Sequence, residues 1–142
     1  NNLLSINSFI AKPLICYESI FSAESLVLEK NVDFILNVSN DGWFGESLAP
    51  YQHLDALVMR SLENQRYSVR STNTGISAII SSEGIIEDYV AFNKTGIINR
   101  EIISRNGNTP LSSHGYDILY SLFFIVFLYS TVYFNIKLFR RL

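Results

Sequence analysis

Short apolar runs separated by polar stretches predict alternating strands and helices in the first part of the chain. Apolar runs at residues 9–15 and 32–39 are typical of buried strands, and Pro13 marks the first as an edge or irregular strand. The spacing of apolar residues over 19–30 and 50–67 instead predicts two helices that each bury one face. The chain therefore begins with the order strand, helix, strand, helix.

Four further apolar runs predict consecutive strands after the second helix. They lie at residues 68–72, 76–81, 85–92 and 97–103. Residues 40–47, which precede the second helix, have the composition of a turn. Strands that first alternate with helices and then follow one another indicate a layered α/β domain.

The last part of the chain has a different pattern. Residues 118–136 include no Asp, Glu, Lys or Arg, and as a helix they would span about 28 Å, close to the ~30 Å hydrocarbon core of a bilayer. Tyrosines lie near both ends of this run, as in the aromatic belts of membrane helices. A buried core helix is the alternative, but the length, the lack of charge and the basic flank favour a membrane. We predict a transmembrane helix over about 117–137, and divide the chain into a body at 1–112 and an anchor at 113–142.

The charged residues are distributed unevenly along the chain. All 13 acidic residues precede residue 118, whereas Lys137, Arg140 and Arg141 form a basic tail, and the formal net charge is -2. An acidic body offers no basic surface for nucleic acid, so we expect no nucleic-acid partner. Because positive residues flank membrane helices on the cytoplasmic side, we expect the tail in the cytoplasm and residues 1–115 in the periplasm.

The start of the chain carries no signal-peptide pattern. A body that crosses a membrane needs such a segment or a preceding membrane helix, so we expect this chain to be the C-terminal part of a longer membrane protein. The single cysteine, Cys16, excludes an internal disulfide. It is therefore either a small buried residue or a thiol with a chemical role.

Cys16 lies where a predicted strand meets a predicted helix. A sulfur at the N-terminus of a helix is favoured as a nucleophile. The backbone N–H of Tyr17 could then point at the oxygen of an attacked carbonyl. Glu18 follows directly, and a carboxylate this close would disfavour the thiolate unless it is turned away or paired. The position alone leaves a buried structural cysteine as the alternative.

Several motifs support the chemical interpretation. They are CYE at 16–18, SNDGWFG at 39–45 and PYQH at 50–53, followed by RSLENQRY at 60–67 and NTGIS at 73–77. In this order they resemble the apolipoprotein N-acyltransferase family, the membrane-bound branch of the nitrilase (carbon-nitrogen hydrolase) superfamily.

The resemblance implies a fold and a catalytic set. The fold is the C-terminal half of a nitrilase-like αββα sandwich, followed by one C-terminal transmembrane helix. The set is Glu-Lys-Cys, with Cys16 as the nucleophile, Tyr17 as the backbone donor to the oxyanion and Glu18 as a supporting residue. The Glu and the Lys of the family lie upstream, and neither Lys12 nor Lys30 replaces that lysine, so this chain alone is expected to be inactive. No cofactor and no metal are implied, and no metal-binding or phosphate-loop motif is present.

The implied reaction has two steps at a bacterial inner membrane. Cys16 takes the acyl chain of a phospholipid donor as a thioester. The free amine of diacylglyceryl-cysteine at the N-terminus of an apolipoprotein then accepts that chain as an amide.

The turn at 40–47 holds further candidate residues. Large apolar side chains such as Trp43 and Phe44 either pack into the domain or, because both implied substrates are lipids, line the acyl entrance or contact the bilayer. Asn40 is predicted to bind substrate with them, although Asn40 and Asp41 also suit a turn.

His53 suggests a Cys-His pair, but the resemblance gives the role of base to a glutamate, so a structural, hydrogen-bonding histidine is favoured. Residues 73–75 are predicted to form a turn between strands that closes on the site.

Two other functions stay open. A membrane-anchored amidase or nitrilase would pass the acyl group to water, although soluble members of that superfamily lack an apolar C-terminal run. A catalytically inactive nitrilase-like module would bind partners without chemistry, and the retained Cys16 argues against it.

Overall fold

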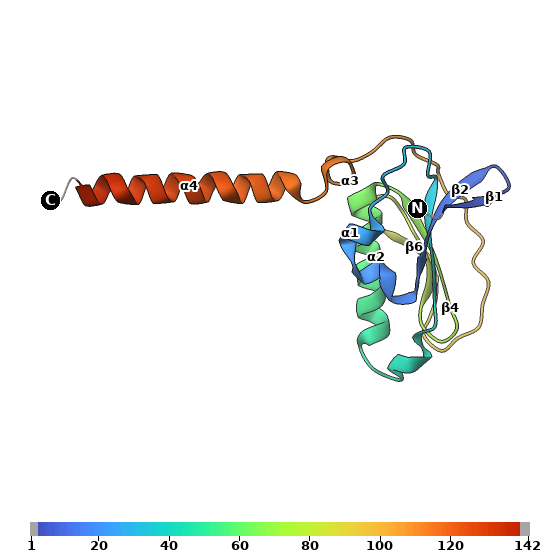
Figure 1. Ribbon diagram of the computed structural model, residues 1–142. Coiled ribbons are helices and arrows are strands. Elements are labelled where there is room, and N and C mark those ends of the chain that lie inside the picture. Colours follow the sequence, from blue (N-terminus) through green and yellow to red (C-terminus); the bar gives the residue numbers. More distant parts are fainter. Residues whose placement is uncertain (1–2, 140–142) are drawn as a thin grey trace.

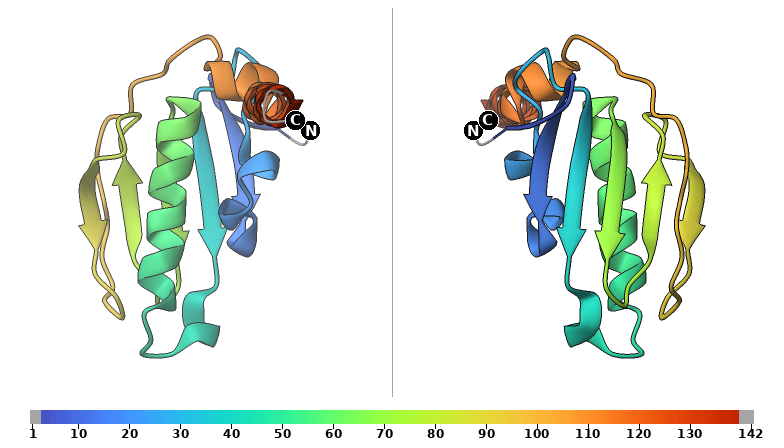
Figure 2. Two further views of the ribbon diagram at one scale, coloured as in Figure 1. Left: turned by 90° about the vertical axis from the view of Figure 1, so that its left-hand side faces the viewer. Right: turned by 90° about the vertical axis from the view of Figure 1, so that its right-hand side faces the viewer.

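The computed structural model describes residues 3–139, and within them six strands form one mixed sheet in the order β1-β2-β3-β4-β5-β6 (Figures 1 and 2). The strands are β1 (Leu4–Ile6), β2 (Phe9–Ile15), β3 (Phe34–Ser39), β4 (Tyr67–Thr72), β5 (Ser77–Ile80) and β6 (Ile86–Val90). β2, β3 and β4 run parallel, and the remaining neighbours pair antiparallel. The parallel strands end at one edge of the sheet, so the residues that follow them gather there.

Helix α2 (Ala49–Asn64) lies across one face of the sheet (Figure 2). Its inward residues Leu54 and Leu57 pack with Leu14, Ile35 and Ile80 in the main core. The strand register brings two polar residues to this same face. Asn37 pairs with both Leu14 and Arg70, and cross-strand partners point to the same side of a sheet. A polar row therefore lies inside the core.

The opposite face of the sheet holds a smaller apolar cluster, made by Ala11, Phe34, Tyr67 and Ile79. Residues 97–103 cover part of it, but they are not the strand that the sequence predicts. Ile98 and Ile102 of this segment pack against the cluster, whereas its backbone is irregular. One β layer and one α layer make half of an αββα sandwich, which confirms the predicted fold class.

The helix predicted over residues 19–30 is also largely wrong. The structure has a 3-10 helix, η1 (Cys16–Ile20), and a single helical turn, α1 (Ser22–Ser25), followed by irregular chain. The amide of Asn64 explains the early end. It donates to the carbonyl of Ser25 at 3.1 Å and accepts from the N–H of Val27 at 2.7 Å, so these backbone groups are paired outside a helix.

The other elements lie close to their predicted positions. β2 agrees with the prediction. Gln65, whose φ of 52° is left-handed, caps the C-terminus of α2, and β4 begins two residues later. The predicted elements did not include β1, a three-residue strand that forms a hairpin with β2.

The chain ends in the short helix α3 (Pro110–His114) and the long helix α4 (Asp117–Phe139). The helix predicted over 117–137 is therefore present. Its window Asp117–Phe134 has a mean hydropathy of 1.7 and no buried residue, so its length and composition allow it to cross a membrane. α4 leaves the domain on the side of α1 and α2 (Figure 1). The tail residues Arg140 and Arg141 lie outside the described residues, and the predicted division after residue 112 falls inside α3.

Side chains attach the segment before α4 to the helical layer. The hydroxyl of Thr109 donates to the carbonyl of Glu63 at 2.7 Å. The amide of Asn108 donates to the carbonyl of Leu28 at 2.7 Å. The hydroxyl of Tyr116, next to α4, bonds that of Ser22 in α1. The start of α4 is thus connected to the layer that includes α1.

Candidate active site

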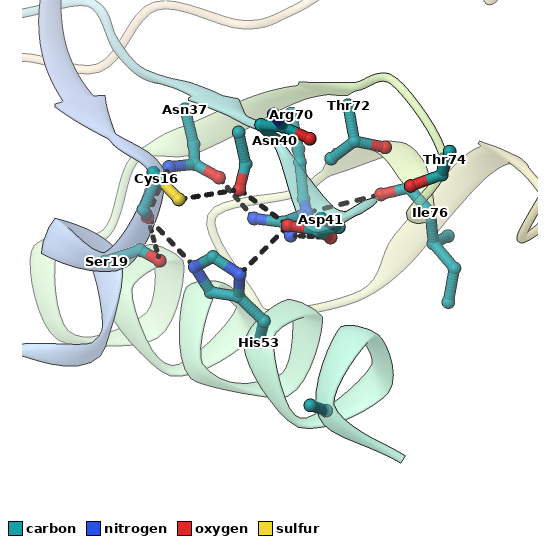
Figure 3. A network of polar contacts seen from close by, with 12 residues as sticks. Cys16, Ser19, Asn37, Asn40, Asp41, His53, Arg70, Thr72, Thr74 and Ile76 are labelled. Carbon is teal, nitrogen blue, oxygen red and sulfur yellow. Dashed lines mark hydrogen bonds and ion pairs between the residues drawn. The ribbon is translucent and has the colours of Figure 1, made fainter. Parts of the chain in front are cut away.

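Cys16 is the first residue after β2 and begins η1. Its φ of 50° lies in the left-handed region, which residues with a Cβ rarely adopt. Such conformations cluster at functional sites, where the surrounding contacts hold them in place. The residue is half-buried and its thiol is free (Figure 3).

Three side chains hold the turn at Cys16. The carboxylate of Glu18 accepts a hydrogen bond from the N–H of Ile15 at 2.6 Å. The hydroxyl of Ser19 donates to the carbonyl of Cys16 at 3.3 Å. The amide of Asn37 donates to the carbonyls of Leu14 at 2.8 Å and Cys16 at 3.3 Å.

The sulfur itself has one hydrogen-bond partner among the described residues. The hydroxyl of Ser39, the last residue of β3, lies 3.4 Å from Sγ of Cys16. The same hydroxyl lies 2.6 Å from Oδ1 of Asp41. Ser39 therefore links the sulfur to a buried carboxylate.

Asp41 is fully buried and receives hydrogen bonds from several directions. Nη2 of Arg70 donates to its Oδ2 at 2.7 Å, and Nδ1 of His53 lies 3.2 Å from its Oδ1. Its own N–H donates to the side chain of Asn73 at 3.1 Å. A buried carboxylate is stable only when it is paired in this way.

Arg70 supplies the positive charge opposite Asp41. It comes from β4, its side chain is fully buried, and it also donates to the carbonyl of Ile76 at 3.2 Å and to the side-chain oxygen of Asn37. Burial lowers the pKa of Arg70, while the adjacent carboxylate of Asp41 opposes that change. The pair brings two opposite charges into the core without net charge.

His53, in the first turns of α2, contacts the backbone of Cys16 rather than its sulfur. Its Nε2 lies 2.9 Å from the carbonyl oxygen of Cys16, and its ring packs edge-on against Phe44 with centroids 5.9 Å apart. Burial lowers the pKa of His53, and the positive charge of Arg70 lowers it further. These contacts are those of a structural, hydrogen-bonding histidine.

The predicted substrate residues lie in or beside the 3-10 helix η2 (Asp41–Phe44). Trp43 is 85% exposed, whereas Phe44 is half-buried against the ring of His53. Asn40 caps η2: its side-chain oxygen accepts from the N–H of Gly42 at 3.1 Å and from the amide of Asn73 at 2.6 Å. Tyr17 is half-exposed, and its ring packs against Phe21 with centroids 5.6 Å apart.

The sequence analysis missed Asn37, Ser39 and Arg70. The signal was present in the strands, because each of these polar residues occupies an inward-facing alternate position in a run that otherwise predicts a core strand. Among residues 3–139, no group of three His, Cys, Asp or Glu side chains is placed to hold a metal ion.

Known proteins are similar to this chain in sequence and in fold. It is 37% identical over 108 residues to an apolipoprotein N-acyltransferase of Nitrosomonas europaea, covering 76% of this chain and 22% of the relative. An apolipoprotein N-acyltransferase of Vibrio parahaemolyticus is also 37% identical, over 80% of this chain and 23% of its own length. The chain thus spans about a fifth of the length of these curated relatives.

A solved structure gives the same picture of the fold. An amidase from Nesterenkonia sp. superposes with a TM-score of 0.55 over 86% of this chain and 46% of its own, at 13% sequence identity. Identity this low supports the fold alone. The family model for carbon-nitrogen hydrolases matches residues 4–108, which include all six strands and Cys16. The chain belongs to the carbon-nitrogen hydrolase family.

Proposed function

We propose that this chain is the nucleophile-bearing part of an apolipoprotein N-acyltransferase. The observation that carries the proposal is the turn at Cys16, where a free thiol with a left-handed backbone stands at the end of a parallel strand. The similarity to named N-acyltransferases supports the reaction class.

In the first step, the sulfur of Cys16 attacks the ester carbonyl of a phospholipid acyl chain. A C–S bond forms, the ester C–O bond breaks, and a lysophospholipid leaves with the proton of the thiol. The backbone N–H of Tyr17, at the start of η1, would stabilise the oxyanion, together with a lysine from upstream sequence. Glu18 supports this step by holding the N–H of Ile15 and hence the turn.

In the second step, the amine of a diacylglyceryl apolipoprotein attacks the thioester on Cys16. An amide forms, the sulfur leaves with the C–S electron pair, and the amine proton passes to a carboxylate base from upstream sequence. The acyl chain is thereby moved between two lipids without a cofactor.

Lipid substrates also give a role to the exposed turn at η2. The indole of Trp43 is almost fully exposed to solvent, which is unusual for so large an apolar side chain. We assign Trp43 to contact with the acyl chain or the bilayer surface, with Phe44 and Asn40 behind it. α4 would anchor the chain in the bacterial inner membrane, with residues 1–115 in the periplasm and the C-terminus in the cytoplasm.

The test uses the full-length protein in detergent with a phospholipid labelled in its acyl chain. We expect hydroxylamine-sensitive label on the peptide that contains Cys16, and an amide product when a diacylglyceryl peptide with a free amine is added. Cys16→Ser should remove the thioester and the amide product, whereas Ser71→Ala, on an exposed position of β4, should retain both.

Two results would contradict the proposal in different ways. Amide formation at an unchanged rate in Cys16→Ser would show that the sulfur is not the nucleophile. Release of free fatty acid with no amide product would instead indicate the amidase or hydrolase chemistry of other carbon-nitrogen hydrolases.

A further inference from the structure

We propose that Ser39 is a further catalytic residue, which donates a hydrogen bond to the sulfur of Cys16 as that sulfur leaves the thioester. The inference rests on the proposed function, because it requires a thioester on Cys16. It concerns one hydroxyl group that contacts the reacting atom directly.

The sheet places Ser39 beside the sulfur. Ile15 pairs with Val38 in the parallel register, so the next residues, Cys16 and Ser39, lie at the same level. Ser39 is 6% exposed, and its hydroxyl lies 3.4 Å from Sγ. This distance allows a hydrogen bond to sulfur, which becomes stronger when the sulfur carries negative charge.

The hydroxyl has one proton and two acceptors. When the sulfur is neutral, the nearer acceptor is Oδ1 of Asp41, at 2.6 Å. When the sulfur becomes negative, the proton can turn to it. Asp41 tolerates this loss, because Arg70 at 2.7 Å and His53 at 3.2 Å still contact its carboxylate. The buried network thus leaves the Ser39 proton available to the sulfur.

The two half-reactions need this proton to different extents. While the lipid ester is cleaved, the bond that breaks is C–O, and the sulfur is already bonded to the acyl carbon. While the amide product forms, the C–S bond breaks and its electron pair stays on the sulfur, next to the hydroxyl of Ser39. The amine proton leaves to the carboxylate base of the second step. A hydrogen-bond donor at Ser39 therefore stabilises the transition state of the second half-reaction specifically.

The experiment measures the two half-reactions separately in the full-length protein. Labelled phospholipid without acceptor gives the rate of thioester formation, and addition of a diacylglyceryl peptide then gives the rate of thioester loss. In Ser39→Ala we expect the loss to slow about tenfold and the formation to slow by less than about threefold. Thioester should consequently accumulate during turnover.

Matched variants separate chemistry from structure. Ser19→Ala removes another buried hydroxyl that contacts the carbonyl of Cys16 but not its sulfur, and it should not accumulate thioester. Ser39→Thr and Ser39→Val introduce side chains of nearly equal size, of which only threonine keeps the hydroxyl. We expect Thr to restore rapid thioester loss and Val to behave like Ala, which keeps the comparison available if Ser39→Ala does not fold.

The outcomes are distinct. Equal slowing of both half-reactions, or no slowing in either, would overturn the role of Ser39 while leaving the thioester in place. Absence of any thioester in the unaltered protein would overturn the proposed function, and with it this inference.

Discussion

Asp41 is the residue on which the polar contacts behind Cys16 converge. It holds Ser39, His53 and Arg70 at once, and two of these contact Cys16 through its sulfur or its carbonyl. Cys16, whose backbone is strained, is therefore surrounded by hydrogen-bond partners that are connected to one another. Local polar networks of this kind position a reacting group more narrowly than packing alone.

The histidine in this network makes stability depend on pH. Because the folded pKa of His53 lies below its ordinary value of 6.5, the unfolded chain binds more protons than the folded chain just below that pH. Its contribution is therefore fully present above pH 6.5 and is lost as the pH falls toward the lowered folded pKa. The melting temperature should therefore decrease as the pH falls below 6.5.

Thermal unfolding of the full-length protein between pH 7.5 and about 5 checks this prediction. The variant His53→Gln removes the titrating ring, so its melting temperature should decline less over the same window. Identical slopes in the two proteins would show that His53 does not cause the pH dependence.

At the residue scale, the sequence supplied candidate site residues but not the side chains that contact them. Cys16, Tyr17 and Glu18 form one contiguous motif, so a resemblance was sufficient to propose them. Asn37 and Arg70 are distant in sequence and become neighbours only through the parallel pairing of β3 and β4. Pattern analysis treats each strand separately and cannot supply that register.

At the scale of elements, the turn between β4 and β5 closes directly on Asp41, as the sequence predicts. A Cβ added at Gly75 would lie 2.0 Å from Oδ2 of Asp41, far inside van der Waals contact. Gly75 is therefore required by the approach of this loop to the carboxylate.

We predict that Gly75→Ala displaces Asp41 and slows thioester formation on Cys16 about 100-fold. Asp41 contacts Ser39 and His53, which contact Cys16, so a shift near 1 Å of its carboxylate would misplace the reacting sulfur. Gly42→Ala is the matched control, since a Cβ there would meet the side chain of Asn40 at 3.1 Å, a contact that a small movement relieves. Rates of acyl labelling measure both variants. Comparable losses in the two would argue against a specific role for the Gly75 contact.

The elements that were predicted incorrectly share a physical cause. In residues 19–30 and 97–103, the spacing of apolar residues indicated a helix and a strand. In the structure, a distant side chain forms hydrogen bonds with the backbone of the first segment, and the second segment packs its apolar side chains against the sheet. The amide of Asn64 bonds the backbone at Ser25 and Val27, and Ile98 and Ile102 partly bury their side chains without forming a strand. Tertiary contacts of this kind override local propensity.

At the scale of the whole molecule, α4 extends from the α/β domain and packs against none of it along its apolar window (Figure 1). Tyr116, Thr109 and Asn108 connect its start to the helical layer. An anchor attached in this way would hold the domain at one orientation to the bilayer.

The proposed topology can be tested with single cysteines in a full-length protein that lacks other reactive thiols. Ile97, 97% exposed in the domain, and Lys137, near the end of α4, are suitable positions. A membrane-impermeant maleimide should label Ile97→Cys in intact spheroplasts and Lys137→Cys only after permeabilisation. Labelling of both from the same side would contradict the topology.

The left-handed backbone of Cys16 has a consequence for the evolution of this protein. A non-glycine residue in that conformation costs about 1–2 kcal/mol, so exchanging Cys16 for glycine would relax the turn and make the fold more durable. The same exchange would remove the atom proposed to receive the fatty chain. Selection for thermal robustness and selection for chemistry therefore oppose each other at a single dihedral angle.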